Sequence, residues 1–302
     1  MRIPFHRSAP LRLCGILLLA ISCRKAEPDP LRRTRIAFAV DREKANRDVL
    51  IVEVDGSNPT VIAPDPSYNE TPAWAPSGLS LVFASTREEV KGLWEWNVRS
   101  GAAVRINETP WIDSAPSVSP DGKSMVFMSN RDGNWEIYVM TADGRRAVRL
   151  TEDPAADYWP AWSPDGTRIA FVSERSGAKD LYVMNPTGKE VKPLTNDRAW
   201  DGRPAWSPDG KQIAWASERE GARAVFVMDA EGKNVKRLTA LDAEADDPSW
   251  SPDGRRIAFV SNRSGFRELW VMNADGTGAR QLTSFRSGVH TPAWSPFLPE
   301  EK

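Results

Sequence analysis

The sequence is poor in the two residue types that most often carry chemistry, cysteine and histidine. The 302-residue chain has two of each, and after residue 22 it keeps only Cys23 and His290. No disulfide can therefore form within residues 23–302. The chain also has no Gly-x-Ser-x-Gly elbow and no His-Glu-x-x-His motif. It gives no support to a serine hydrolase or a zinc peptidase, and we expect a protein that is not an enzyme.

Excess charge and long apolar runs are missing as well. The chain has 40 Lys and Arg against 41 Asp and Glu, so its net charge is −1. A nearly neutral, mildly acidic surface does not attract nucleic acid through bulk electrostatics. The apolar run Leu13–Ile21 is nine residues long, which is too short for a membrane-spanning helix.

Residues 1–22 have the layout of a secretory signal peptide. Three arginines precede the apolar run, and the small residue Ser22 follows it. The end of this segment, Leu-Ala-Ile-Ser-Cys at 19–23, resembles a bacterial lipobox, although the usual leucine position holds Ala20. The resemblance implies that Cys23 is the lipid-modified first residue of the mature protein. The alternative is an ordinary signal peptide that ends near a cysteine.

Residues 23–33 would then be the lipidated cysteine and a charged tether interrupted by two prolines. We expect the protein on the periplasmic side of the bacterial envelope, held by the lipid anchor. Arg24 follows Cys23 where an aspartate would stand in some lipoproteins of the inner membrane. This favours the outer membrane over the inner one.

The strongest pattern in the chain is a repeat of 44 residues. The motif Pro-Ala-Trp-Ser-Pro-Asp-Gly is complete at 204–210. Full, altered or shortened copies open at six prolines that are 44 residues apart: Pro72, Pro116, Pro160, Pro204, Pro248 and Pro292. A fixed period of this length indicates a solenoid, a propeller or another array.

Each repeat unit reads as four antiparallel strands. In the unit that opens at Pro248, a short strand is followed by the turn 251–254, and further strands are expected at 256–261, 268–272 and 279–283. The last copy stops at 297, after its first strand, whereas the first β segment, 35–40, matches the second strand of a unit. The end of the chain therefore supplies the strand that its beginning lacks.

We predict an all-β, six-bladed β-propeller of four-stranded antiparallel blades, in which the C-terminal strand joins the three N-terminal strands. The propeller is expected to span 34–297, with residues 298–302 as a tail. Units start near 72, 116, 160, 204 and 248, and the closing blade combines 34–62 with 290–297.

The repeat resembles that of TolB-type propellers of the WD-like β-propeller repeat family. The shared pattern is Pro-x-Trp-Ser-Pro-Asp-Gly, then Ile-Ala-Phe, Tyr-Val-Met and Arg-Leu-Thr, and Pro160–Thr195 and Pro248–Thr283 carry it nearly intact. The resemblance implies a non-enzymatic scaffold that binds a protein or peptide of the envelope, such as a Pal-like lipoprotein. TolB-type proteins also have an α/β domain before the propeller, and residues 24–33 are too few to form one.

The repeated serines and the Asp-Gly pairs have structural explanations. Ser163, Ser207 and Ser251 recur at one turn of the unit, so we do not assign them as nucleophiles. The pairs at 143–144 and 275–276 lack the alternating carboxylates of a calcium loop and read as hairpin turns. We expect no metal, no cofactor and a monomer.

Two sets of repeated charged residues are expected on the face formed by the loops between strands two and three and the loops that lead into strand one. The arginines could form a ring of guanidinium groups, or each could pair with an aspartate and brace adjacent loops, which we favour. The arginines are Arg87, Arg131, Arg175, Arg219 and Arg263. The aspartates are Asp113, Asp157 and Asp201.

Large aromatic residues outside the repeat are expected on the same face, in the loops that lead into strand one. They are Tyr68, Trp111, Tyr158, Trp159 and Trp200. They could form a hot spot for a partner or a lid over the central channel. The strictly repeated tryptophans are assigned to packing between blades; these are Trp74, Trp162, Trp206, Trp250 and Trp294.

Two functions remain open at this point. One is an anchored scaffold that binds a protein or peptide through the aromatic and arginine face. The other is a propeller that binds or cleaves carbohydrate, with aromatic platforms for sugar rings and the three aspartates for proton transfer.

Overall fold

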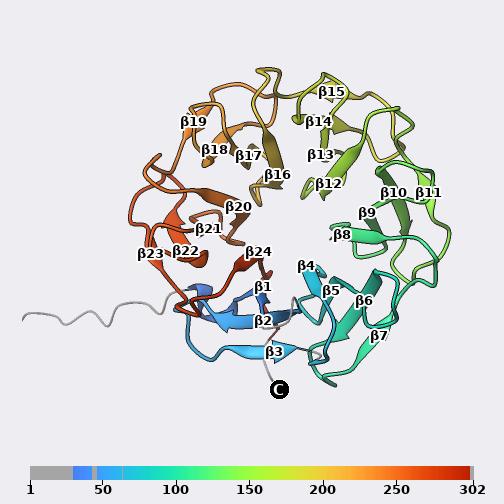
Figure 1. Cartoon of the computed structure of the whole chain (residues 1–302), viewed down its shortest axis with the longest axis horizontal. Helices are drawn as coiled ribbons and strands as arrows, with labels where there is room; N and C mark the ends of the chain where they lie inside the picture. The colour runs from blue at the N-terminus through green and yellow to red at the C-terminus, as the bar shows by residue number, and fades with distance from the viewer. Residues whose placement is uncertain (1–29, 43–45, 63, 300–302) are drawn as a thin grey trace, which may run out of the picture.

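The computed structural model of the chain describes residues 30–299 except 43–45 and 63. In this part, six four-stranded antiparallel sheets stand as blades around a central axis (Figure 1). The predicted signal peptide, Cys23 and most of the tether lie outside the described residues. No helix among the described residues is long and apolar enough to cross a membrane.

The blades are numbered along the chain, from the innermost strand outward. Blade I contains β24 (Val289–Trp294), β1 (Arg35–Asp41), β2 (Arg47–Glu53) and β3 (Thr60–Ile62). Blade II contains β4 (Asn69–Trp74), β5 (Ser80–Ser85), β6 (Gly92–Asn97) and β7 (Ala103–Arg105). Blade III contains β8 (Asp113–Val118), β9 (Ser124–Ser129), β10 (Glu136–Thr141) and β11 (Val148–Arg149).

The other three blades follow the same plan. Blade IV contains β12 (Asp157–Trp162), β13 (Ile169–Ser173), β14 (Asp180–Met184) and β15 (Lys192–Pro193). Blade V contains β16 (Asp201–Trp206), β17 (Gln212–Ser217), β18 (Ala224–Asp229) and β19 (Lys236–Arg237). Blade VI contains β20 (Ala245–Trp250), β21 (Arg256–Ser261), β22 (Glu268–Asn273) and β23 (Arg280–Gln281). One short 3-10 helix, η1 (Pro30–Arg33), precedes β1.

Closure of the ring follows the prediction. β24, the last strand, is hydrogen-bonded to β1, with Trp294 opposite Ile36 and Val289 opposite Val40. The indole of Trp294 also donates to Thr34 Oγ1 at 2.9 Å. The six-bladed fold and its closure by the C-terminal strand are therefore confirmed.

The repeated Ser-Pro-Asp-Gly segment forms the turn between strands one and two, and its serine and aspartate bond to each other. In blade IV, Ser163 Oγ accepts from the amide of Arg168 at 2.9 Å, and Asp165 Oδ1 accepts from the amide of Thr167 at 3.0 Å. The hydrogen bond from the Ser163 side chain lowers the pKa of Asp165 to about 2. These serines thus serve the turn, as the repeat indicated.

The innermost strands begin three residues before the motif prolines, which corrects the expected strand boundaries. Each of these strands has a bulge just before or at its proline, as between Tyr158 and Ala161 in β12. A bulge tolerates proline because the ladder bond that proline cannot make is already interrupted. Tyr158 and Trp159 therefore belong to β12 and not to the loop that leads into it.

The core consists of apolar layers between neighbouring blades. Trp206 of blade V packs with Val183 of blade IV and Ile213 of its own blade. The indole nitrogen of Trp206 donates to the carbonyl of Ala161 at 3.1 Å. The repeated tryptophans therefore join the blades that carry them to the blade before, and we call the layer between any two neighbouring blades a seam.

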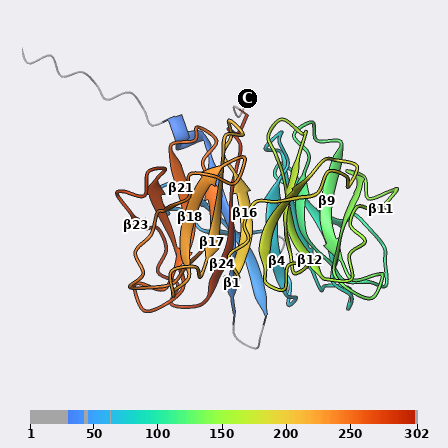
Figure 2. The same ribbon diagram turned by 90° about the horizontal axis from the view of Figure 1, so that it is seen from above.

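The two faces of the ring differ in what they carry. The turns between strands one and two lie on one face, here called the turn face, together with η1 and the C-terminal end (Figure 2). The amide of Leu298 donates to the carbonyl of Arg33 at 2.8 Å, so the two ends of the described chain meet there. The innermost strands begin on the opposite face, here called the mouth face.

Candidate binding face at the channel mouth

Six residues with left-handed backbone conformation line the central channel. They stand at the third position of each innermost strand, 44 residues apart, with φ between 48° and 52°: Thr71, Ala115, Trp159, Arg203, Asp247 and Thr291. Together with the prolines that follow them, they enclose a cavity of about 120 Å³. Because this conformation recurs in all six blades, it belongs to the repeat. The side chains differ between blades and give the channel its chemistry.

Aromatic rings and cations stack on one another where blades IV and V meet the channel. The ring of Trp159 lies 5.5 Å from Tyr158 and 6.2 Å from Trp200, centroid to centroid. Arg203 lies 4.9 Å above the Trp159 ring, and Lys179 lies 4.4 Å above the Tyr158 ring. Arg223 lies 4.1 Å above Trp200. These six half-buried residues are called the Trp159 cluster below.

Gly202 allows the indole of Trp200 to lie against β16. A Cβ atom built on Gly202 would be 2.5 Å from the Trp200 ring, closer than such atoms approach in proteins. The corresponding residues of the neighbouring blades are Tyr158 and Asp246. The small residue at this position therefore places Trp200 in contact with Trp159.

Two adjacent carboxylates in blade VI neutralise the arginines of this region. Arg203 Nε lies 2.6 Å from Asp247 Oδ1, and Arg223 Nη1 lies 3.0 Å from Asp246 Oδ2. Burial and the charge of Asp247 raise the pKa of Asp246. Asp247 is fully buried, which would raise its pKa, but Arg203 and a hydrogen bond from the amide of Thr291 lower it below its usual value.

A second aromatic and cationic group lies where blades I and II meet the channel. Tyr68 is covered by Arg47 at 4.7 Å and by Lys91 at 5.0 Å from its ring centroid. Glu70 accepts from Lys91 at 2.7 Å. Burial would raise the pKa of Glu70, but the charges of Lys91, Arg203 and Arg47 outweigh it, and the pKa is lowered.

The remaining predicted aromatic, Trp111, stands apart from both groups. It lies before β8, and 46% of its surface is exposed. Sequence reasoning missed two further exposed aromatics, Phe266 and Phe285, which are 48% and 37% exposed, and the stacked cations of the Trp159 cluster. Comparing the residue before each motif proline would have identified Arg203 and Asp247.

The arginine set is engaged within its blades. Arg131, Arg175 and Arg219 each place Nη2 3.0–3.1 Å from a carboxylate oxygen of Asp113, Asp157 and Asp201. Arg87 pairs with Asp65. Arg263 has Ala245 where an aspartate would stand, and its Nη2 is buried without a hydrogen-bond partner among the described residues. This geometry agrees with bracing of adjacent loops and not with a free guanidinium ring.

Each of these arginines also lies over two aromatic rings of its own blade. Arg175 is 5.5 Å from the ring of Phe171 and 5.0 Å from that of Tyr182. Asp113, Asp157 and Asp201 are completely buried, and burial raises the pKa of Asp157 and of Asp201. Carboxylates held in this way are poorly placed to transfer protons to a substrate in the channel.

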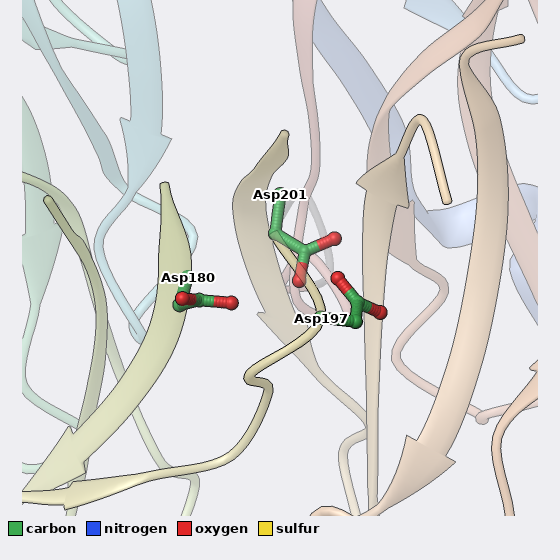
Figure 3. A group of neighbouring side chains, drawn as sticks. All are labelled: Asp180, Asp197 and Asp201. Carbon is green, nitrogen blue, oxygen red and sulfur yellow. The ribbon is translucent and has the colours of Figure 1, made fainter. Parts of the chain in front are cut away.

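Three carboxylates come close together near the start of blade V. Oxygen atoms of Asp180, Asp197 and Asp201 lie within 4.8 Å of one another (Figure 3). Arg219 Nη2 lies 3.1 Å from both Asp197 Oδ2 and Asp201 Oδ2. Asp180 accepts from Thr195 Oγ1 at 3.2 Å. The arginine already supplies the positive charge that a metal ion would bring, so the cluster reads as an ion-pair network.

His290 lies at the start of β24, beside the channel. Its Nε2 is 2.9 Å from Asp41 Oδ2. Burial lowers the pKa of His290, although the hydrogen bond to Asp41 opposes this shift. The described mouth residues can stack on rings and pair with charges, and we see no nucleophile with an adjacent base among them.

Comparisons with known proteins agree with this architecture. The chain is similar to the crystal structure of TolB from Acinetobacter baumannii, with 28% identity and a TM-score of 0.79 over 88% of this chain and 67% of that one. It is also similar to a putative TolB from Agrobacterium tumefaciens, with 22% identity and a TM-score of 0.71 over 84% of this chain and 91% of that one.

A third similarity concerns the fold alone. An oligogalacturonate lyase from Vibrio parahaemolyticus matches with 15% identity and a TM-score of 0.55 over 82% of this chain and 71% of that one. No protein with a curated description matches significantly. The family model of the TolB beta propeller domain matches residues 30–298. Because this match spans most of the sequence, the chain belongs to the TolB beta propeller domain family.

Proposed function

We propose that the protein is a non-enzymatic scaffold that binds a protein or peptide through its mouth face. The observation that carries this proposal is the Trp159 cluster, in which three aromatic rings and three cations stack beside the channel. Tryptophan, tyrosine and arginine are the residues most enriched in interface hot spots. Their partial exposure leaves ring surface for a partner to cover.

The charge at the mouth supports a partner with mixed polarity. Arg203 and Arg223 are balanced by Asp247 and Asp246, and Lys91 is balanced by Glu70. A surface balanced in this way has little long-range attraction for a highly charged ligand. It favours a peptide that offers apolar side chains for the rings and backbone groups for the charged atoms.

The location belongs to the same proposal. We place the protein on the periplasmic side of the bacterial envelope, anchored through Cys23 and favouring the outer membrane. The lipobox resemblance and the TolB family support this. The described chain begins on the turn face, so a tether there would leave the mouth face pointing away from the anchoring membrane. A Pal-like lipoprotein is the partner that the family resemblance favours, and we expect a monomer.

Site-specific cross-linking tests the proposed face. A photoreactive residue replaces Trp111, which is exposed on the mouth face, or Phe297, which is 45% exposed near the C-terminal end on the turn face. We expect a partner to be cross-linked in the envelope only from position 111. Mass spectrometry identifies it, and equal cross-linking from position 297 would contradict the proposal.

Substitution of the aromatic residues gives the matching loss of function. Replacing Trp111, Trp159 and Trp200 together by alanine should abolish capture of the identified partner by the C-terminally tagged full chain. The control is Phe297→Ala, which should capture as the wild type does. A single cooperative thermal transition shows that the ring is intact, and retained capture by the triple variant would contradict the role of this face.

A carbohydrate-binding function is the second candidate. Tyr158 and Trp159 form adjacent aromatic surfaces, which suit the apolar faces of sugar rings. Cleavage has less support because Asp113, Asp157 and Asp201 are buried and paired with arginines. A glycan screen with the wild type and Trp159→Ala separates the candidates, since saturable binding that depends on Trp159 would favour carbohydrate.

A further inference from the structure

The seam between blades II and III contains an open pocket on the turn face. Its volume is about 350 Å³, which falls in the range of small-molecule sites. The walls include Pro76, Val82, Val118, Pro120 and Met125, which are apolar. This pocket is well separated from the mouth face, because turns between strands one and two form its rim.

The pocket exists because blade III lacks the repeated tryptophan. Val118 stands where the other five blades have Trp74, Trp162, Trp206, Trp250 and Trp294. At the seam between blades IV and V, Trp206 fills the corresponding space against Val183 and Ile213. The ring of Trp206 is further covered by Arg168, at 4.7 Å, whereas the equivalent residue at the pocket is Ser80. The fold thus leaves an indole-sized space in one seam.

One wall of the pocket carries a carboxylate at a position where the other five blades have an aliphatic residue. Glu95 lines the pocket and lies opposite Val82 in the sheet. The equivalent residues of the other blades are Ile51, Val139, Val183, Val227 and Val271. Glu95 is half-buried, and its carboxylate makes no hydrogen bond or ion pair with any described residue. A half-buried carboxylate without a partner favours a cationic ligand.

We propose that this pocket binds a small aromatic amine, with the ring in the space of the missing indole and the ammonium group on Glu95. The five other blades show that an indole fits this position of the repeat. In blade V the indole nitrogen donates to the carbonyl of Ala161, and in blade II it donates to that of Ala293. The residue of blade II that corresponds to Ala161 in the repeat is Ala73. A free small molecule can combine an indole-sized ring with a cation, which no single natural side chain does.

Fluorine NMR of 5-fluorotryptamine with the full-length protein tests this proposal. We expect saturable binding with a dissociation constant of about 1 mM or tighter, as ligands of this size allow. 5-Fluoroindole-3-propionate has the same ring and chain length but a carboxylate, and it should not bind saturably. Absence of saturable binding of 5-fluorotryptamine, or equal binding of the carboxylate, would overturn the proposal.

Variants assign the binding to this pocket. Glu95→Gln keeps the shape and should weaken binding about tenfold, because it removes a charged hydrogen-bond acceptor. Val118→Trp should abolish binding by filling the space. Glu190→Gln is the matched control, since Glu190 lines the cavity of about 270 Å³ at the seam between blades IV and V, and it should change nothing. Binding that survives both Glu95→Gln and Val118→Trp contradicts the assignment.

Discussion

The seam between blades IV and V and the seam between blades II and III follow one plan but are filled differently. The first contains Trp206, the stacked Arg168 and Val183, and the second contains Val118, Ser80 and Glu95 at the same positions. Both seams occur in the same closed ring. A single seam can therefore lose its tryptophan without loss of the fold, and such departures from the repeat show where the chain has freedom for other tasks.

The largest expected effect comes from making the first seam resemble the second. Trp206→Val removes a buried indole and its hydrogen bond to the carbonyl of Ala161. We expect the free energy of unfolding to fall by about 3 kcal/mol, as for other large-to-small changes in cores. Urea denaturation measures this loss. A loss below about 1 kcal/mol would mean that a seam with valine is about as stable as a seam with tryptophan.

The converse change should sharpen the comparison. Val118→Trp inserts the repeat's own residue into a cavity of about 350 Å³. We expect a gain of about 1 kcal/mol in the free energy of unfolding, which is typical of cavity filling. Glu95→Val in the same chain should add to this gain, because it restores the apolar wall of the other seams. Denaturation of the single and double variants measures both steps, and destabilisation by Val118→Trp would show that the space does not accept the indole.

The mouth ends of the two seams differ as well, and a smaller change tests that difference. Gly202→Ser gives blade V the residue that blade III has at this position, Ser114. The new Cβ atom would collide with the ring of Trp200, so the ring must leave Arg223 and Trp159. We expect a stability loss of about 1 kcal/mol from the lost stacking and weaker capture of the partner. Ser114→Gly, with no ring to displace, is the control and should preserve capture.

The smallest expected effect concerns the turns, which both seams share. The Ser163 bond lowers the pKa of Asp165 to about 2 in the folded protein, below its ordinary value of 3.8. A lowered pKa of an acid stabilises the folded state above pH 3.8, and this contribution is lost as the pH falls towards 2. Because Asp165 is largely exposed, solvent screens the effect. We expect the thermal midpoint of Asp165→Asn to change slightly less between pH 4 and pH 2 than that of the wild type. A steeper dependence in the variant would contradict the assignment.

The fold could be predicted from the sequence because its signals are local and repeated. The motif prolines and the Asp-Gly turns mark each strand, and the incomplete units at 34–62 and 290–297 predict the closing blade. The candidate site was predicted only in part. Trp159 and Trp200 were selected as aromatics outside the repeat, but their contact depends on Gly202 and on the bulge in β12.

Other features required the coordinates. The cations Lys179, Arg203 and Arg223 lie on three different strands or loops, so no sequence window contains them together. The pocket at the second seam depends on Glu95 of blade II and Val118 of blade III. These two residues lie on neighbouring blades and line the same pocket. Aligning the six repeat units position by position shows that Glu95 and Val118 are both unusual. The alignment does not show that they line one pocket.

The pairing of β24 with β1 also sets the order of events in folding. Five blades are each formed from one continuous stretch of the chain, whereas blade I needs Val289–Trp294 beside Arg35–Asp41. During synthesis the first three strands emerge early and have no fourth neighbour until almost the whole chain is available. Joining such distant segments is an entropically costly, late step. Until it occurs, the edge of β1 that pairs with β24 is open to other strands, which exposes the incomplete ring to aggregation.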